Sequence, residues 1–113
     1  QEKVNWVKYP FLASHPQHEI AKKQMKKGGN IVTFEIKGGV EAGRAFLNSI
    51  NMCSLSANLG DTRTIVTHPA SSTHSKLSKE ERLEVGITDG LIRISTGLEN
   101  ISDIVSDLQQ ALN

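Results

Sequence analysis

The feature that most constrains the fold is the segment IVTFEI, residues 31–36, which is followed by a pair of glycines. Val32, Phe34 and Ile36 fall on one face of an extended chain, with polar side chains between them. A strand with one apolar face needs a covering layer, so we expect a sheet that packs against helices. The 113 residues, 37% of them hydrophobic, suffice for one such core, and therefore for one domain.

Strand and helix patterns alternate along the rest of the chain. The expected strands are residues 3–12, 31–36, 52–56, 63–68 and 91–95, and the expected helices are residues 15–27, 39–51, 78–85 and 101–112. This order predicts a two-layer α/β sandwich, an α+β fold, in which the helices bury their apolar stripes on one face of the sheet.

Helix ends are marked by recognisable residues. Ser14 and Gln17 have the capping-box spacing, and Gly28–Gly29 supplies a stop. Ser78 and Glu81 repeat the box for a short helix.

Two further positions bear on the helices. Asn100 is suited to cap the last one, whose expected apolar stripe is Ile101, Ile104, Val105, Leu108 and Leu112. Gly43 in the helix at residues 39–51 is suited to close packing on the sheet.

Arg93 interrupts the strand LIRIS, residues 91–95, and raises the question of what lies on the second face of the sheet. Alternation places Ile92 and Ile94 toward the helices and Arg93 on the opposite side. One interpretation is an arginine on a solvated face. The other is that a second domain covers this face and that the planar guanidinium binds a carboxylate in two-pronged fashion.

Composition excludes several classes of function. A net charge of +1 gives no field to attract nucleic acid. No apolar run approaches the roughly 18 residues of a spanning helix, so no membrane partner is expected. A single cysteine, Cys53, favours a reducing, cytoplasmic setting.

The chain begins with Gln1 and enters an apolar alternation at once, so we expect a piece of a longer protein.

A polar stretch, residues 56–74, lies in the middle of the chain and is rich in hydroxyl groups. Its Ser and Thr side chains, Ser71 to Thr73 among them, can hold turns through local bonds to the backbone. A metal site is disfavoured because the histidines and Cys53 lack a recognised zinc spacing. A Ser–His hydrolase is disfavoured because the chain has no G-x-S-x-G elbow.

Three separated motifs, residues 9–29, 54–87 and 89–100, together resemble the C-terminal domain of the Cys/Met-metabolism family of pyridoxal 5'-phosphate (PLP) enzymes. The resemblance covers nearly the whole chain in order. Within the family, the sequence Ala57-Asn58-Leu59-Gly60 looks most like that of the direct sulfhydrylases, O-succinylhomoserine sulfhydrylase above all, although O-acetylhomoserine enzymes share it. The acyl group therefore stays open.

The resemblance implies a small mixed, largely antiparallel sheet, as in the small domain of fold-type I PLP enzymes. It also implies that Arg93 binds the substrate α-carboxylate and that Asn58 helps to hold it through an amide N–H. The resemblance further implies that Leu59, Gly60 and His68 bind the substrate and that residues 68–74 lie near the mouth of the active site. Gly60, which has no Cβ, would let the backbone pass close to a ligand.

The activity implied is γ-replacement in methionine biosynthesis, in which the acyloxy group of an O-acylhomoserine leaves the γ-carbon as a carboxylate (succinate for the succinyl ester) and sulfide takes its place, giving homocysteine. No lysine of the chain stands in the family's Ser-x-Thr-Lys context. The resemblance therefore assigns PLP to a large domain of the same protein, outside residues 1–113, predicts that these residues alone are inactive, and implies a homotetramer at full length. The alternative is a stand-alone module that binds an amino acid or anion, or mediates oligomerisation.

Overall fold

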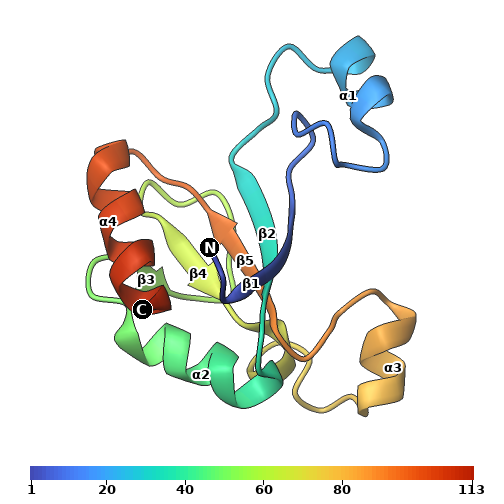
Figure 1. The fold of residues 1–113 in the computed structure, drawn as a ribbon. Coiled ribbons are helices and arrows are strands. Elements are labelled where there is room, and N and C mark those ends of the chain that lie inside the picture. Colours follow the sequence, from blue (N-terminus) through green and yellow to red (C-terminus); the bar gives the residue numbers. More distant parts are fainter.

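The computed structural model describes residues 1–113 (Figure 1). The strands are β1 (Val4–Lys8), β2 (Ile31–Ile36), β3 (Ser54–Leu55), β4 (Ile65–Thr67) and β5 (Leu91–Ser95). The helices are α1 (His18–Gln24), α2 (Gly39–Ser49), α3 (Lys79–Glu84) and α4 (Ile101–Leu112), with a 3₁₀ turn η1 (Pro69–Ser71). All nine strands and helices expected from the sequence are present.

The five strands form one sheet in the order β1-β2-β5-β4-β3. Neighbouring strands are antiparallel except β3 and β4, which are parallel. The expected α+β fold with a small mixed, largely antiparallel sheet is confirmed. β5 is the last strand in the sequence but the central strand of the sheet. Its side chains therefore lie in the middle of each face of the sheet.

The core lies between the sheet and the helices α2 and α4. Ile92 and Ile94 of β5 are 0% and 3% exposed, and they join residues of both helices in a single apolar cluster. Within that cluster Phe34 of β2 meets Phe46 of α2 edge to face, with ring centroids 5.7 Å apart. The apolar alternation of β2 and β5 therefore predicted the core face correctly.

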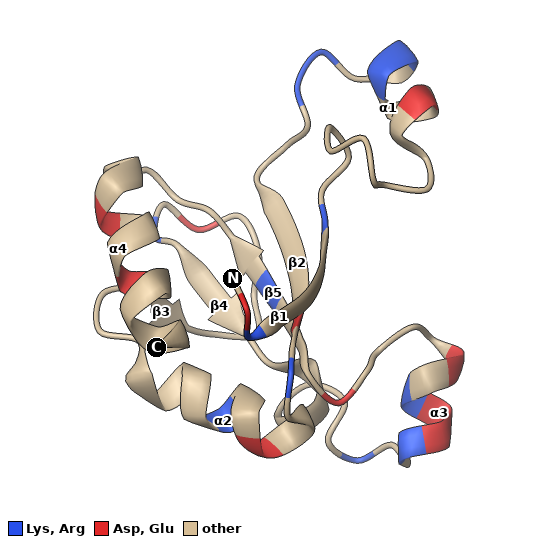
Figure 2. Cartoon of the chain, in the orientation of Figure 1, with Lys and Arg blue, Asp and Glu red and all other residues tan.

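Helices α1 and α3 lie away from this layer, beyond opposite ends of the sheet (Figure 1). Only Ala21 of α1 is buried, and α3 has no buried residue. Much of the charge of the chain is carried on these two projections (Figure 2). The prediction that the helices cover one face of the sheet therefore holds for α2 and α4, while two short polar helices stay outside the core.

The start of α1 differs from the prediction. The Ser14 capping box does not form; the helix begins at His18, and the backbone N–H of Gln17 donates to His15 Nδ1 at 3.0 Å. Successive turns occupy residues 9–18 instead, with Leu12, His15 and His18 each bonded to the residue three before.

The end of α1 also differs. The helix stops at Gln24, before the glycine pair. Gly28 instead lies against the Tyr9 ring, where a Cβ would come within 2.5 Å of the Tyr9 hydroxyl, and that hydroxyl donates to the Gly29 carbonyl at 3.0 Å. The glycines therefore close the base of the α1 projection and do not cap the helix.

The other two caps agree with the prediction. Ser78 and Glu81 form a complete capping box at α3, and the side chain of Asn100 accepts from Ser102 N–H at the start of α4. The apolar stripe of α4 is only partly buried, since Ile101 and Val105 are 68% and 43% exposed. No helix combines the length and the apolar character that crossing a membrane requires.

Candidate functional site

Arg93 lies in the middle of β5 and points to the face of the sheet opposite α2 and α4. Its neighbours Ile92 and Ile94 belong to the core cluster, and side chains alternate along a strand. The register sets Thr33 of β2 and Thr67 of β4 directly beside Arg93 on the same face. The sequence-based orientation of Arg93 is therefore confirmed.

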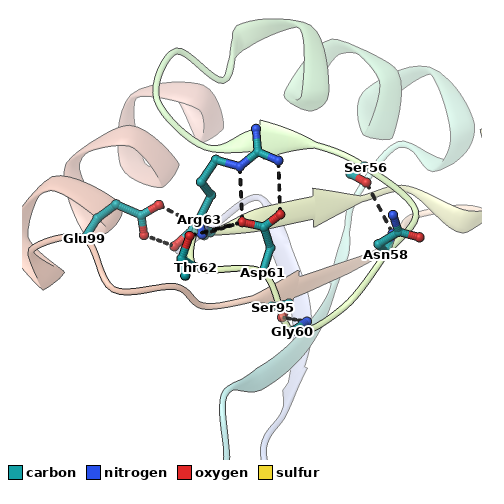
Figure 3. Close-up of polar contacts among 9 residues, drawn as sticks. Ser56, Asn58, Gly60, Asp61, Thr62, Arg63, Ser95 and Glu99 are labelled. Atoms are coloured by element: carbon teal, nitrogen blue, oxygen red, sulfur yellow. Dashed lines mark hydrogen bonds and ion pairs between the residues drawn. The ribbon is translucent and has the colours of Figure 1, made fainter.

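A loop, residues 56–63, crosses this face of the sheet (Figure 3). Its residues Ala57 and Asn58 contact Arg93. The Thr67 hydroxyl donates to the Ser56 carbonyl, and Gly60 N–H donates to Ser95 Oγ at 3.4 Å. Thr67 and Ser95 consequently have almost no exposed surface although they point away from the core. We call residues 56–63 the crossing loop.

The base of the crossing loop is held by ionised groups. The Asp61 carboxylate accepts from the backbone N–H of Arg63 at 2.9 Å and from its guanidinium at 3.0 Å (Figure 3). The Arg63 guanidinium holds the pKa of Asp61 down at about 2. Glu99 accepts from Thr64 N–H and Oγ1 at 2.6 and 2.7 Å, and these bonds lower the pKa of Glu99. Both carboxylates therefore stay charged at neutral pH.

The guanidinium of Arg93 contacts the crossing loop through a single nitrogen. Nη2 donates to the Ala57 carbonyl at 2.9 Å and to the Asn58 carbonyl at 3.4 Å. Every ion pair of the chain involves other residues, so no carboxylate neutralises Arg93, and its Nε and Nη1 donors make no hydrogen bond within the chain. An anchored guanidinium with free donors is suited to receive an external carboxylate.

The crossing loop brings Asn58, Leu59 and Gly60 to the surface near Arg93, and all three are exposed. Asn58 N–H donates to Ser56 Oγ at 3.3 Å, while its side-chain amide has no partner in the chain. Gly60 has φ +75°, and no atom lies within 4 Å of the place where a Cβ would be. The left-handed backbone thus accounts for this glycine, rather than a close approach to other parts of the chain.

His68 does not join this group. It follows Thr67, so its ring points to the helix side, where it is 0% exposed and fills the space left by Gly43. Its Nε2–H donates to the Asp89 carbonyl at 2.7 Å, and its Nδ1 pairs with Ser71 Oγ at 2.7 Å. Both ring nitrogens are used internally, so the geometry gives the expected substrate-binding role of His68 no support.

The polar stretch therefore divides into two parts. Residues 56–63 border Arg93, whereas Ser71 and Ser72 hold the turn η1 by bonding to His68, Ser72 Oγ donating to its carbonyl at 2.8 Å. The turn interpretation therefore fits Ser71 and Ser72. The expected position of residues 68–74 near the active-site mouth stays a prediction.

Some residues of the site could not be found from sequence. The contacts of Arg93 are carbonyl oxygens of Ala57 and Asn58, which every residue type possesses. Ser95 was detectable in part, because alternation in β5 places it on the face of Arg93.

A site for PLP or for a metal ion needs other side chains than a site for a substrate carboxylate. All nine lysines, the only side chains able to form a Schiff base with PLP, are exposed on the surface. No lysine lies in an enclosed, polar pocket, so the residues present do not fit the cofactor. No three His, Cys, Asp or Glu side chains gather as metal ligands.

The chain is similar to known proteins over nearly its whole length. A family model described as Cys/Met metabolism PLP-dependent enzyme matches residues 1–113. L-methionine gamma-lyase of Fusobacterium nucleatum subsp. polymorphum is 58% identical over 110 residues, which are 97% of this chain and 28% of the relative. O-acetyl-L-homoserine sulfhydrylase 1 of Thermus thermophilus is 46% identical over 113 residues, 99% of this chain and 27% of the relative.

Among solved structures, cystathionine gamma synthase from Xanthomonas oryzae pv. oryzae, in complex with aminoacrylate and cysteine, superposes with a TM-score of 0.90 at 40% identity. The match covers 99% of this chain and 29% of that one. The chain thus spans well under a third of the length of the relatives that it matches.

Proposed function

Because the chain belongs to the Cys/Met metabolism family of PLP-dependent enzymes over residues 1–113, we propose that it is the substrate-binding C-terminal domain of such an enzyme. In this role Arg93 binds the α-carboxylate of an amino-acid substrate. The PLP-binding residues then belong to a larger domain outside this chain, and residues 1–113 by themselves are inactive.

The observation that carries the proposal is the unpaired Arg93 guanidinium. An arginine that is fully buried is almost always paired with an opposite charge, and partial burial already removes part of its hydration. Arg93 is half-buried and has only two carbonyl contacts, both through Nη2. These contacts restrain the Nη2 end of the guanidinium in advance, which reduces the entropy lost when a carboxylate binds.

Asn58 completes the carboxylate site in this proposal. Its backbone carbonyl already contacts Arg93, so the side chain starts close to any ligand that the guanidinium holds. An amide NH₂ can donate to a carboxylate oxygen, and the Asn58 amide has no competing partner. Leu59 and Gly60 shape the same exposed bend, while His68 is left as a structural residue.

The activity that we propose for the whole protein is that of an O-acylhomoserine sulfhydrylase, which makes homocysteine from the acylated amino acid and sulfide. The Ala57-Asn58 sequence and the sulfhydrylase relative support this choice. A second candidate is γ-elimination from L-methionine, which the 58% identity to a methionine gamma-lyase favours. Both substrates present the same α-carboxylate to Arg93, so the product formed, homocysteine or a thiol with a keto acid, separates the two activities.

The test is the Arg93→Lys variant of the whole protein. A point charge replaces a planar fork, so we expect KM for the amino-acid substrate to rise about 10- to 100-fold while the fold is retained. Arg44→Lys is the matched control, since Arg44 lies on α2, pairs with Glu41 at the surface and has no contact with the crossing loop, so KM should stay near the wild-type value. Equal kinetics of Arg93→Lys and the wild type would reject the proposal.

A further inference from the structure

Ser95 is a polar residue that is almost fully buried on the Arg93 face of the sheet. It stands two residues after Arg93 on β5, so the two side chains point to the same side, roughly 7 Å apart along the strand. Only 1% of Ser95 is exposed. In the register it pairs with Ile31 of β2 and with Ile65 of β4. The Ser95 hydroxyl is therefore carried by a strand that has neighbours on both sides.

Two N–H groups from distant parts of the chain donate to Ser95 Oγ. Gly60 N–H of the crossing loop donates at 3.4 Å (Figure 3), and Asn30 Nδ2 donates at 3.3 Å. A hydroxyl oxygen has two acceptor sites, so these two donors use both of them. Asn30 occupies one site and leaves the other for Gly60.

Asn30 is held in place by Thr96, the residue after Ser95. The Asn30 carbonyl accepts from Thr96 N–H at 2.9 Å and from Thr96 Oγ1 at 3.0 Å, and Asn30 Nδ2 donates to the Thr96 carbonyl at 3.2 Å. A carbonyl oxygen can only accept, so the nitrogen of the Asn30 amide must lie on this side. Asn30 is exposed, but these bonds make it a fixed donor for Ser95.

The bend formed by Asn58, Leu59 and Gly60 is attached to β5 at both of its ends. The Asn58 carbonyl accepts from Arg93 Nη2 at 3.4 Å, and Gly60 N–H donates to Ser95 Oγ. The first attachment uses the guanidinium to which we assign the substrate carboxylate. The second attachment is independent of that guanidinium, so it holds the bend both with and without a ligand.

We propose that Ser95, oriented by Asn30, is a positioning residue that keeps the Asn58 amide beside Arg93 for binding of the substrate carboxylate. Ser95 does not touch the substrate, and it acts through Gly60 on the bend that carries Asn58. The inference rests on the proposed function, in which Arg93 and Asn58 hold the carboxylate. It adds the residues that arrange this pair in advance, which lowers the entropic cost of binding.

The first test separates positioning from a general contribution to stability. In the whole protein, Ser95→Ala removes the acceptor for Gly60 N–H, so we expect KM for the amino-acid substrate to rise about 3- to 10-fold while kcat changes less. A loss of folded protein alone would lower the apparent kcat and leave KM unchanged, because KM does not depend on enzyme concentration. An unchanged KM in Ser95→Ala would overturn the proposal.

Ser49→Ala is the matched control for the removal of a hydroxyl group. The Ser49 hydroxyl donates to the Ala45 carbonyl within α2 and has no contact with the crossing loop. Both kinetic constants of this variant should stay near the wild-type values.

Asn30→Ala tests the same arrangement without a change in the interior of the sheet. Because Asn30 is exposed, this variant serves even if Ser95→Ala folds poorly. Ser95 can then turn away from Gly60, so we expect KM to rise about 2- to 5-fold. A wild-type KM in Asn30→Ala would contradict the proposal.

The last test asks whether Ser95 acts through Asn58. In an Asn58→Ala background the amide that the bend positions is absent, so Ser95→Ala should raise KM by less than about 2-fold further. An equal rise in both backgrounds would overturn the proposal. The Arg93→Lys variant keeps the two claims apart. A raised KM in Arg93→Lys with an unchanged KM in Ser95→Ala rejects the positioning role alone, whereas an unchanged KM in Arg93→Lys rejects the proposed function and this inference with it.

Discussion

At the scale of single residues, the Asp107 carboxylate holds in place the connection between α2 and β3, which has no regular secondary structure. It is almost fully buried on α4 and accepts from three consecutive backbone N–H groups and one side-chain amide: Asn51 at 2.8 Å, Met52 at 2.9 Å, Cys53 at 2.8 Å and Gln110 Nε2 at 3.1 Å. Burial alone would raise the pKa of Asp107, but these bonds outweigh it and lower the pKa from 3.8 to about 2.

Asp107→Asn should lower the free energy needed to open this connection locally by about 2 kcal/mol, because a neutral amide retains only one acceptor oxygen. Hydrogen exchange of its amides should then be about 30-fold faster. Exchange at the amides of Asn51, Met52 and Cys53 in the whole protein measures the effect. The exposed Asp103→Asn is the control on the same helix and should leave these amides protected. Unchanged protection in Asp107→Asn would show that other contacts hold the segment.

The pH dependence of the same amides follows from the direction of the shift. A carboxyl group whose pKa is lowered in the folded state stabilises it above the ordinary pKa and loses that contribution as pH falls through the folded value. Protection, corrected for intrinsic exchange, should be constant down to about pH 4 and fall as pH approaches about 2. Asp107→Asn should lack this drop.

Residue orientation on strands was predictable, whereas the partners of those residues were not. Arg93 was placed on the correct face because side chains alternate along β5. Asp107 gave no sequence signal, since its backbone partners lie more than 50 positions earlier in the chain. The family resemblance implied a substrate-binding role for His68, but the residue follows Thr67 at the end of β4, so alternation sends its ring to the other face.

At the scale of elements, α2 is packed against the turn η1 through a single glycine. A Cβ on Gly43 would lie 2.4 Å from His68 Nε2, closer than real contacts allow. Because His68 is also fixed by Asp89 and Ser71, its ring cannot swing aside without breaking two hydrogen bonds. Sequence predicted close packing at Gly43, and the structure supplies the contact, a buried imidazole beside the sheet.

Gly43→Ala should therefore destabilise the whole protein by about 1 to 3 kcal/mol through overpacking. The sign is diagnostic, since the same change in an unobstructed helix stabilises by about 1 kcal/mol. The midpoint of chemical denaturation measures it. In a His68→Ala background, where the ring is absent, the cost of Gly43→Ala should shrink. A stabilising Gly43→Ala in the wild-type background would contradict the packing described here.

Capping signals predicted α3 and failed for α1, and the difference lies in what surrounds them. At α3 the box of Ser78 and Glu81 satisfies itself locally. At α1 the chain first makes a series of turns, and the glycine pair is committed to packing on Tyr9. Local patterns determine an element only where no tertiary contact competes for the same residues.

At the scale of the whole molecule, the sheet has two incompletely covered surfaces with different chemistry. One carries Arg93 and the crossing loop. The other has an apolar groove between β1 and α4, lined by Val4, Val7 and Leu108 among others. Sequence patterns predicted the layers and the uncovered face of Arg93. They did not predict the strand order, because β5 pairs with β2 and β4 through contacts that are distant in sequence.

The central claim is that Arg93 recognises an α-carboxylate. The most direct measurement compares the affinity of the whole protein for an amino-acid ligand and for the same ligand with its carboxylate converted to an amide. We expect the wild type to prefer the acid by about 10- to 100-fold and Arg93→Met to bind both about equally, because the charge-assisted bonds are then lost in either case. If Arg93→Met retains the wild-type preference for the acid, another group binds the carboxylate and the claim is wrong.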